Sequence, residues 1–174
     1  MADLRTEYLG LALKSPVIAG SSGLTGNIDS LKAIAAAGAG AVVLKSVFEE
    51  EIYLEFAREF HKLGPMDSNL EFLDYYDLDI KKDNLKNYLS LISEAKAVLD
   101  IPVIASINCV TSQEWGFFAQ KIEAAGADAI ELNMFITPAN LSQSSHDNES
   151  IYFDVITRVT HKLKIPVSVK ISPY

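Results

Sequence analysis

The sequence predicts an α/β protein of the TIM (β/α)8-barrel class, and two sets of internal repeats support this prediction. The segment AAGAGAVVLK at residues 36–45 resembles AAGADAIELN at residues 124–133. A proline, a short apolar stretch and a polar residue follow one another in three further segments, at residues 15–22, 101–108 and 165–172. Such repeats are typical of successive strand–helix units, and right-handed crossovers make their strands parallel.

A barrel is favoured over an open, doubly wound sheet. A dinucleotide-binding sheet of the Rossmann type requires GxGxxG after its first strand, whereas residues 20–23 are GSSG. A complete (β/α)8 barrel has about 250 residues, and this chain has 174. We therefore assign residues 1–174 to the N-terminal part of one barrel domain, with about five strand–helix units preceded by a β-hairpin.

The expected strands follow from short apolar segments. The hairpin is expected at residues 4–13, where two alternating stretches flank Gly10. Each parallel strand is a short apolar run of the kind that is buried on both faces. We expect these strands at residues 16–19, 41–44, 102–107, 127–132 and 167–171.

Amphipathic segments separate these strands and are expected to form the crossover helices. Asn27 precedes the first of them as an N-cap, and Thr111 with Glu114 forms a capping box for a later one. Two more helices are expected, from about Asp83 to Leu99 and from near Asn148.

The connection between the second and third strands is longer than one crossover helix requires. Residues 49–63 have a helical pattern that Gly64-Pro65 ends. The excursion over about residues 46–80 is therefore a candidate lid or substrate loop. We expect residues 49–74 to lie over the C-terminal ends of the strands and to be more mobile than the core.

Composition narrows the class of protein. No apolar run reaches the roughly 18 residues that cross a membrane, and the N-terminus lacks the pattern of a secretory signal. The single cysteine, Cys109, excludes an internal disulfide framework, agrees with a cytoplasmic location and is interpreted as a buried, unreactive thiol. The formal charge of −8 argues against nucleic acid or an anionic membrane as a partner but not against a small anionic ligand.

Polar residues stand where the predicted strands end. Asn108 follows the third strand, and the segment GADAIELNMFITPAN at residues 126–140 carries the fourth strand directly into a polar loop. Lys45 and Lys170 each follow an apolar run at the end of a strand. In α/β folds the C-terminal ends of parallel strands meet at one face, where ligands bind. The alternatives are lysines that extend to solvent and asparagines that serve turns.

These strand ends resemble those of the dihydroorotate dehydrogenase family of flavin barrels. The resemblance lies in SSG after the first strand, LKS after the second, ELN and a later P.N after the fourth, and VKISPY at the fifth. IASINCVTSQEW is similar to a stretch of the flavin domain of dihydropyrimidine dehydrogenase. The resemblance covers the whole chain but only the first half of the family's barrel.

The resemblance implies an FMN-dependent oxidoreductase. In pyrimidine biosynthesis this family oxidises dihydroorotate to orotate, so an anionic or imide-like small molecule is the implied substrate and a homodimer the implied assembly. The resemblance assigns cofactor-binding roles to Ser21, Ser22, Lys45, Asn108, Asn133 and Lys170. It assigns substrate-binding roles to Lys45, Asn69, Asn133 and Asn140, and no residue to a metal.

The sequence departs from the family at the expected catalytic base. The family has approximately NLSCPN, with the cysteine or a serine taking the proton, whereas residues 133–140 are NMFITPAN. The longer loop places Thr137 or Ile136 at the base position, depending on the alignment. Isoleucine accepts no proton and an unassisted threonine is a poor base, so Thr137 is a weak candidate beside Lys45.

Two other departures concern the substrate and the phosphate. DYY at residues 74–76 is kept, but Asn69 alone represents the asparagine-rich stretch that precedes it in the family. The glycine-rich loops of the family's later strands, which hold the flavin phosphate, have no counterpart in this sequence.

Two other functions remain open. The chain can represent a relative that binds flavin or another ligand without oxidising dihydroorotate. It can also represent a barrel aldolase or isomerase without flavin, in which Lys170 forms a Schiff base and Lys45 lowers its pKa. For the structure we expect Lys45, Asn133 and Lys170 to converge at one face. We also expect unpaired edges on the first and fifth strands, with partly uncovered inner faces at Val17, Ile18, Val167 and Val169.

Overall fold

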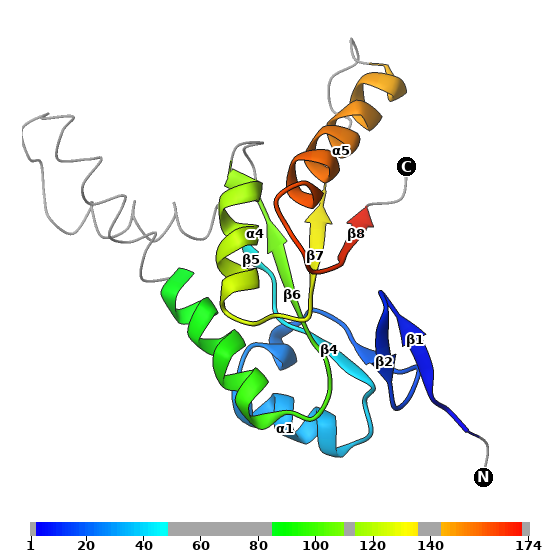
Figure 1. Cartoon of the computed structure of the whole chain (residues 1–174), viewed down its shortest axis with the longest axis vertical. Helices are drawn as coiled ribbons and strands as arrows, with labels where there is room; N and C mark the ends of the chain where they lie inside the picture. Colours follow the sequence, from blue (N-terminus) through cyan, green and yellow to red (C-terminus); the bar gives the residue numbers. More distant parts are fainter. Residues whose placement is uncertain (1–2, 49–84, 110–113, 136–143, 172–174) are drawn as a thin grey trace, which may run out of the picture.

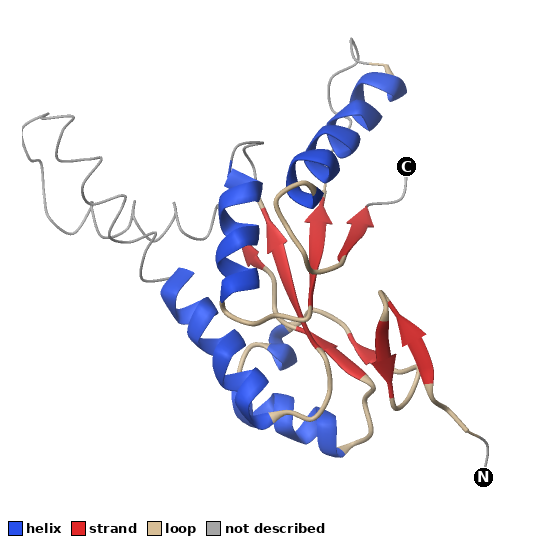
Figure 2. Ribbon diagram, in the orientation of Figure 1, coloured by secondary structure: helices blue, strands red, loops and turns tan. Residues whose placement is uncertain are grey.

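The computed structural model describes residues 3–48, 85–109, 114–135 and 144–171, in which one curved sheet is flanked by helices (Figures 1 and 2). The N-terminal part comprises strands β1 (Thr6–Tyr8), β2 (Leu11–Leu13) and β3 (Ile18–Ala19), the 3-10 turn η1 (Gly23–Thr25), helix α1 (Ile28–Ala36), and strands β4 (Ala41–Val43) and β5 (Val47–Phe48). A helix over residues 85–98 precedes β6 (Val103–Asn108), α4 (Glu114–Ala124), β7 (Ala129–Met134), α5 (Ser145–Thr160) and β8 (Val167–Ile171).

The main sheet is parallel throughout. Its strand order is β3-β4-β6-β7-β8, and β5 pairs with β6 beyond the end of β4. The five predicted strands are all present, and the curled sheet with its crossover helices forms half of a barrel, as predicted. β7 begins at Ala129, two positions later than expected. The reason is that Asp128 belongs to the preceding turn, where its N–H donates to Val103 O and its carboxylate accepts from the Val103 N–H.

Helix starts follow local capping chemistry. Asn27 caps α1 as predicted, because its Oδ1 accepts from the Ser30 N–H at 2.9 Å. Helix α5 begins at Ser145, before the predicted Asn148, because Ser144 and Asp147 cap each other reciprocally. The expected capping box at Thr111 lies outside the described residues.

The N-terminal hairpin closes one end of the sheet's inner face. Its two-residue turn has positive φ at Leu9 (55°) and Gly10 (73°), which matches the twist of the flanking strands. Leu13 is buried with the inner-face residues Val43 and Ile104. The hairpin therefore covers apolar side chains near the N-terminal ends of the strands.

The opposite face of the sheet carries the larger core. Side chains of β4, β6 and β7 alternate, and those that point outward pack against the four helices. This core includes Val42, Val103, Ile107 and Leu132 from the strands, and Leu31, Ile92, Ile122 and Val155 from the helices. Cys109, predicted to be buried, is half-buried at the edge of this core.

The inner face changes from apolar to polar along the strands. Ile104 pairs with Ala129 near the N-terminal ends of the strands, and two residues further along, at the next level, Ser106 pairs with Glu131. Another two residues along, one level higher, Asn133 pairs with Lys170 at the C-terminal ends of β7 and β8. Because alternate residues share a face, the strands bring these polar groups together on the inner side.

A one-residue bulge interrupts the pairing of β4 and β5 with β6. Val43 pairs with Ile104 and Val47 with Ile107, so four steps on one side match three on the other (43 to 47 against 104 to 107). Ser46 sits in this bulge, and its N–H donates to Ser21 Oγ rather than to β6. The bulge therefore explains why β4 ends at Val43, one residue before the predicted end.

Tyr88, from the helix over residues 85–98, reaches the β6 backbone beside this bulge. Its hydroxyl accepts from the Ser106 N–H at 2.9 Å and donates to the Ser106 carbonyl at 3.0 Å. Burial raises the pKa of Tyr88, and the charge of Glu131 adds to the rise, while the bond with the Ser106 backbone opposes it. The phenol therefore stays protonated and keeps both hydrogen bonds.

The two end strands of the sheet, β3 and β8, have one partner each among the described residues, as predicted. Val17 is 63% exposed and Val169 is 36% exposed, and Ile18 packs against the inner core. The predicted inner-facing position of Val167 and Val169 is wrong. Val167 pairs with Ile130 and joins the outer core, and Val169 shares its face.

Several expectations fall outside the described residues. They are the excursion at about residues 46–80, apart from residues 46–48, and the positions of Asn69, Ile136, Thr137 and Asn140. Within the described part of the chain, no helix is long and apolar enough to span a membrane.

We predict that the isolated 174-residue chain self-associates. Open strand edges and exposed apolar side chains near β3 and β8 promote association. We also expect the isolated segment 1–174 to bind no FMN, because it contains no glycine-rich loop of the kind that the resemblance assigns to the flavin phosphate. Light scattering and flavin absorbance on the purified chain test this, and a monodisperse, yellow monomer would contradict it.

We predict that Tyr88→Phe lowers the free energy of unfolding by about 1–3 kcal/mol, because two buried backbone groups of Ser106 lose their hydroxyl partner. Urea unfolding measures the change. Tyr152→Phe is the matched control, since the buried hydroxyl of Tyr152 has no hydrogen-bond partner in the described structure. Equal losses in the two variants would show that the Tyr88 hydroxyl has no special role.

Candidate functional site

The C-terminal ends of β6, β7 and β8 bring three predicted site residues together. Asn133 and Lys170 are paired neighbours on β7 and β8. Asn108, at the end of β6, donates from Nδ2 to the Asn133 carbonyl at 2.9 Å. Asn108 and Asn133 are half-buried, whereas Lys170 is more exposed. The parallel register thus places two amides and one ammonium at the same end of the sheet.

Lys45 lies at the same end but not in the same row. Its N–H donates to the Thr25 carbonyl, and a methyl group on Gly26 would lie 3.6 Å from Lys45 Cβ and 3.7 Å from Cδ. The Lys45 side chain therefore runs beside the turn that follows β3. Because of the bulge, it is the side chain of the next residue, Ser46, that bonds to β6, through the hydroxyl of Ser106.

A continuous series of hydrogen bonds crosses the inner face from the loop after β3 to β8. Ser46 Oγ lies 3.1 Å from Ser21 Oγ and 2.7 Å from Ser106 Oγ. Ser106 Oγ donates to Glu131 Oε1 at 2.8 Å, and Lys170 Nζ donates to the same oxygen at 2.7 Å. We call these five residues (Ser21, Ser46, Ser106, Glu131 and Lys170) the polar chain.

The loop after β3 presents its backbone to open space. Ser22 is exposed, and Thr25 Oγ1 accepts from the Ser22 N–H and donates to the Ser22 carbonyl, both at 3.0 Å. A methyl group added at Gly20 or Gly23 would meet no atom within 4 Å. A ligand can therefore approach this loop closely, next to Ser21 and Ser22.

The donors at this end of the sheet suit an electron-rich, planar ligand. They comprise an ammonium, side-chain amides and hydroxyls, which bind carbonyl and imide edges and stabilise negative charge. The described residues contain no cluster of three or more His, Cys, Asp or Glu side chains that could hold a metal ion. The ammonium and the amides are donors of the kind that hold the edge of a flavin ring.

Four residues that build this site were not predicted from the sequence. Three of them belong to the polar chain, namely Ser46, Ser106 and Glu131. The fourth is Tyr88, whose hydroxyl bonds the β6 backbone at Ser106. Two of them had a detectable signal. Glu131 precedes Asn133 by two residues and Ser106 precedes Asn108 by two, so strand alternation places each pair on one face.

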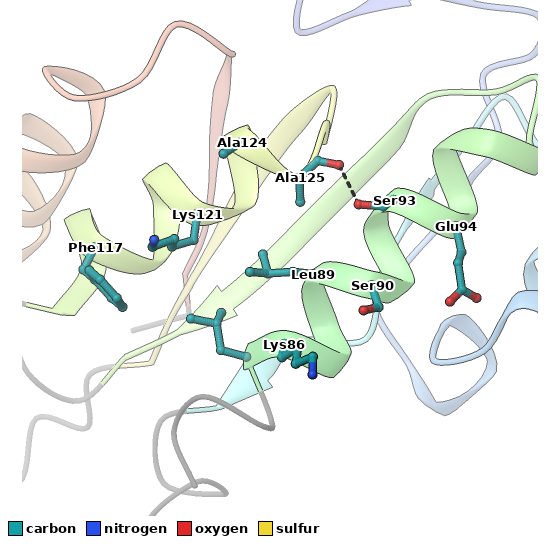
Figure 3. A pocket seen from close by; sticks show the side chains of 10 residues that line it. Lys86, Leu89, Ser90, Ser93, Glu94, Phe117, Lys121, Ala124 and Ala125 are labelled. Carbon is teal, nitrogen blue, oxygen red and sulfur yellow. Dashed lines mark hydrogen bonds between the residues drawn. The ribbon is translucent and has the colours of Figure 1, made fainter. Parts of the chain in front are cut away.

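A separate hollow lies outside the sheet, between the helix over residues 85–98 and α4 (Figure 3). Leu89 and Phe117 line it, and Ser93 Oγ donates to the Ala125 carbonyl at one end. It contains none of the predicted site residues. We therefore place the candidate site at the strand ends rather than in this groove.

Comparison with known proteins gives a consistent set of relatives. The catalytic subunit of dihydroorotate dehydrogenase B (NAD(+)) from Thermoplasma volcanium is 26% identical over 99% of this chain and 55% of its own length. The subunit of the same name from Methanocaldococcus jannaschii is 29% identical, covering 98% and 54%. That from Methanocella arvoryzae is 32% identical, covering 94% and 52%.

The fold has a match among solved structures, and no family model matches the sequence. A dihydrodipicolinate synthase from Bacillus anthracis superposes with a TM-score of 0.51 at 14% identity, over 88% of this chain and 44% of that one. At this identity the match concerns the barrel fold alone. The sequence comparison shows that this chain is similar to dihydroorotate dehydrogenase B catalytic subunits over nearly all of its own residues, and that it spans about half the length of these relatives.

Proposed function

We propose that this chain forms part of an FMN-dependent oxidoreductase of the dihydroorotate dehydrogenase type. The observation that carries the proposal is the row of Asn108, Asn133 and Lys170 at adjacent strand ends, backed by the polar chain. The proposal is also supported by relatives that are named for this activity and that match nearly the whole of this chain. The proposal concerns the whole protein, which acts on a small molecule, and it includes a cytoplasmic location and a homodimer.

Lys170 is assigned to the electron-rich edge of the flavin. When bound, the flavin supplies the capacity to accept a hydride, and its reduced form carries negative charge. A fixed ammonium stabilises that charge because it needs no reorganisation during the reaction. Lys170 is already fixed, since its Nζ lies 2.7 Å from Glu131 Oε1.

The amides and the β3 loop are assigned to orientation of the ring and substrate. Asn108 and Asn133 offer donors and acceptors that match an imide edge. Ser22 and the backbone around Gly20 and Gly23 leave room for close approach. Lys45, whose side chain lies beside the turn after β3, is assigned to both the flavin and the substrate. Asn69 and Asn140 lie outside the described residues and stay assigned to the substrate by the resemblance alone.

For dihydroorotate oxidation, the sequence offers no effective proton acceptor at the position where the resemblance places the base. Thr137 or Ile136 stands where relatives of this type are expected to have cysteine or serine, and neither is an effective base. A related dihydropyrimidine-like substrate, or ligand binding without turnover, is therefore the second candidate. A Schiff-base aldolase is disfavoured, because Lys170 in its ion pair with Glu131 is a poor nucleophile.

We predict that the whole protein, of which we propose this chain is a part, is yellow and that Lys170→Met weakens its FMN binding, in contrast to the isolated 174-residue chain. The variant loses the ammonium that faces the flavin, while the apolar stem keeps its volume. Fluorescence titration with FMN measures the affinity, with Lys96→Met as a control for loss of a lysine elsewhere in the fold. A colourless protein that binds no added FMN would refute the proposed function.

We predict that the yellow protein oxidises dihydroorotate slowly or not at all, because the base position is occupied by Thr137 or Ile136. Anaerobic addition of dihydroorotate, followed by flavin bleaching, gives the rate. Thr137→Cys is expected to raise it only in part, since the loop stays longer than in the family. Rapid bleaching of the unmodified protein would show that another residue takes the proton.

A further inference from the structure

Glu131 holds an unusual position for a carboxylate. It lies in the middle of the inner face, where its side chain is only 15% exposed. One oxygen, Oε1, accepts from both Ser106 Oγ and Lys170 Nζ. A half-buried carboxylate is costly to desolvate, and a well-packed apolar residue often stabilises a fold as well. Its presence therefore calls for a reason other than stability.

We propose that Glu131 is a positioning residue that fixes the Lys170 ammonium at the strand ends. The proposal rests on the proposed flavin site, because it assigns Glu131 a role toward that site through Lys170. Glu131 itself lies one level lower on the inner face, paired with Ser106 and Ser168. It acts on the ligand by holding the lysine, not by direct contact.

The side chain of Lys170 needs such an interaction to become ordered. Its side chain is 45% exposed at the end of the edge strand β8, and a free lysine stem has many rotamers. The ion pair, in which Lys170 Nζ lies 2.7 Å from Glu131 Oε1, stabilises one of these rotamers. Since β8 has only β7 as a neighbour in the described structure, a bond from β7 to the Lys170 side chain orients a group that the sheet alone would leave loose.

The carboxylate is in turn held from its other side. Ser106 Oγ donates to it at 2.8 Å, and Ser46 and Ser21 continue the hydrogen bonds as far as the loop after β3. Tyr88 fixes the backbone of Ser106 through both its N–H and its carbonyl. The position of one ammonium thus depends on contacts that cross the whole half barrel.

The opposite end of the sheet provides a matched comparison. Lys96 Nζ lies 2.7 Å from Asp128 Oδ1, with the lysine side chain 34% exposed. Asp128 also accepts from the Val103 N–H, in the turn before β7. This pair joins a helix to the N-terminal ends of the strands, away from the candidate site.

The first test is chemical labelling of lysines without any flavin. The protein is treated briefly with acetic anhydride, and modification of each lysine is followed by mass spectrometry. Glu131→Gln is expected to raise the labelling rate of Lys170 several-fold and to leave that of Lys96 unchanged. Asp128→Asn is expected to do the reverse. An unchanged rate at Lys170 in a folded Glu131→Gln protein would overturn the proposal.

A second variant tests the same proposal if Glu131→Gln does not fold. Ser106→Ala keeps both charges and removes only the hydroxyl that supports the carboxylate. It is expected to raise Lys170 labelling in the same direction but less. No change at Lys170 in this folded variant would contradict the role assigned to Ser106 and, with it, the proposal.

The second test asks whether Glu131 acts through Lys170. The reduction potential of bound FMN is measured in the unmodified protein, in Glu131→Gln, in Lys170→Met and in the double variant. Glu131→Gln is expected to shift the potential when Lys170 is present and to have no effect in the Lys170→Met background. Equal shifts in the two backgrounds would show that Glu131 acts by its own charge and would overturn the proposal.

The two tests separate this inference from the proposed function. A protein that binds no flavin refutes the proposed function, and the labelling experiment still decides whether Glu131 positions Lys170. A protein that binds flavin but shows unchanged Lys170 labelling supports the proposed function and refutes the inference.

Discussion

The parallel register between β6 and β7 is the constraint on which the rest of the site depends. It sets Ser106 beside Glu131 on the inner face and sends the intervening apolar residues outward to the helices. Because parallel strands run in one direction, every strand then delivers its last polar residue to the same end. The same register that builds the core therefore also assembles the candidate site.

The bulge between β4 and β5 interrupts their pairing with β6. On the inner face it turns Ser46 toward Ser106 and moves Lys45 beside the β3 turn. At the backbone, the Tyr88 hydroxyl bonds both polar groups of Ser106. Bulges commonly occur next to functional sites because they redirect a side chain without ending the sheet.

Charge is placed unevenly along the inner face. The chain as a whole carries a formal charge of −8, yet the cations Lys45 and Lys170 both belong to the C-terminal ends of the strands. Glu131 balances one of them from the level below. The proposed site therefore offers positive charge locally to a small anionic or electron-rich ligand, although the overall charge is negative.

The sequence alone determined the order of the strands, their parallel direction, the hairpin, the Asn27 cap and the residues at the strand ends. These features depend on local patterns: apolar runs, turn residues and capping side chains. Tertiary structure decided the pairing of Glu131 with Lys170, the inward turn of Ser46 and the outward face of Val167. These depend on register and on a single extra residue in one strand, and a shift of one residue reverses the face of every side chain.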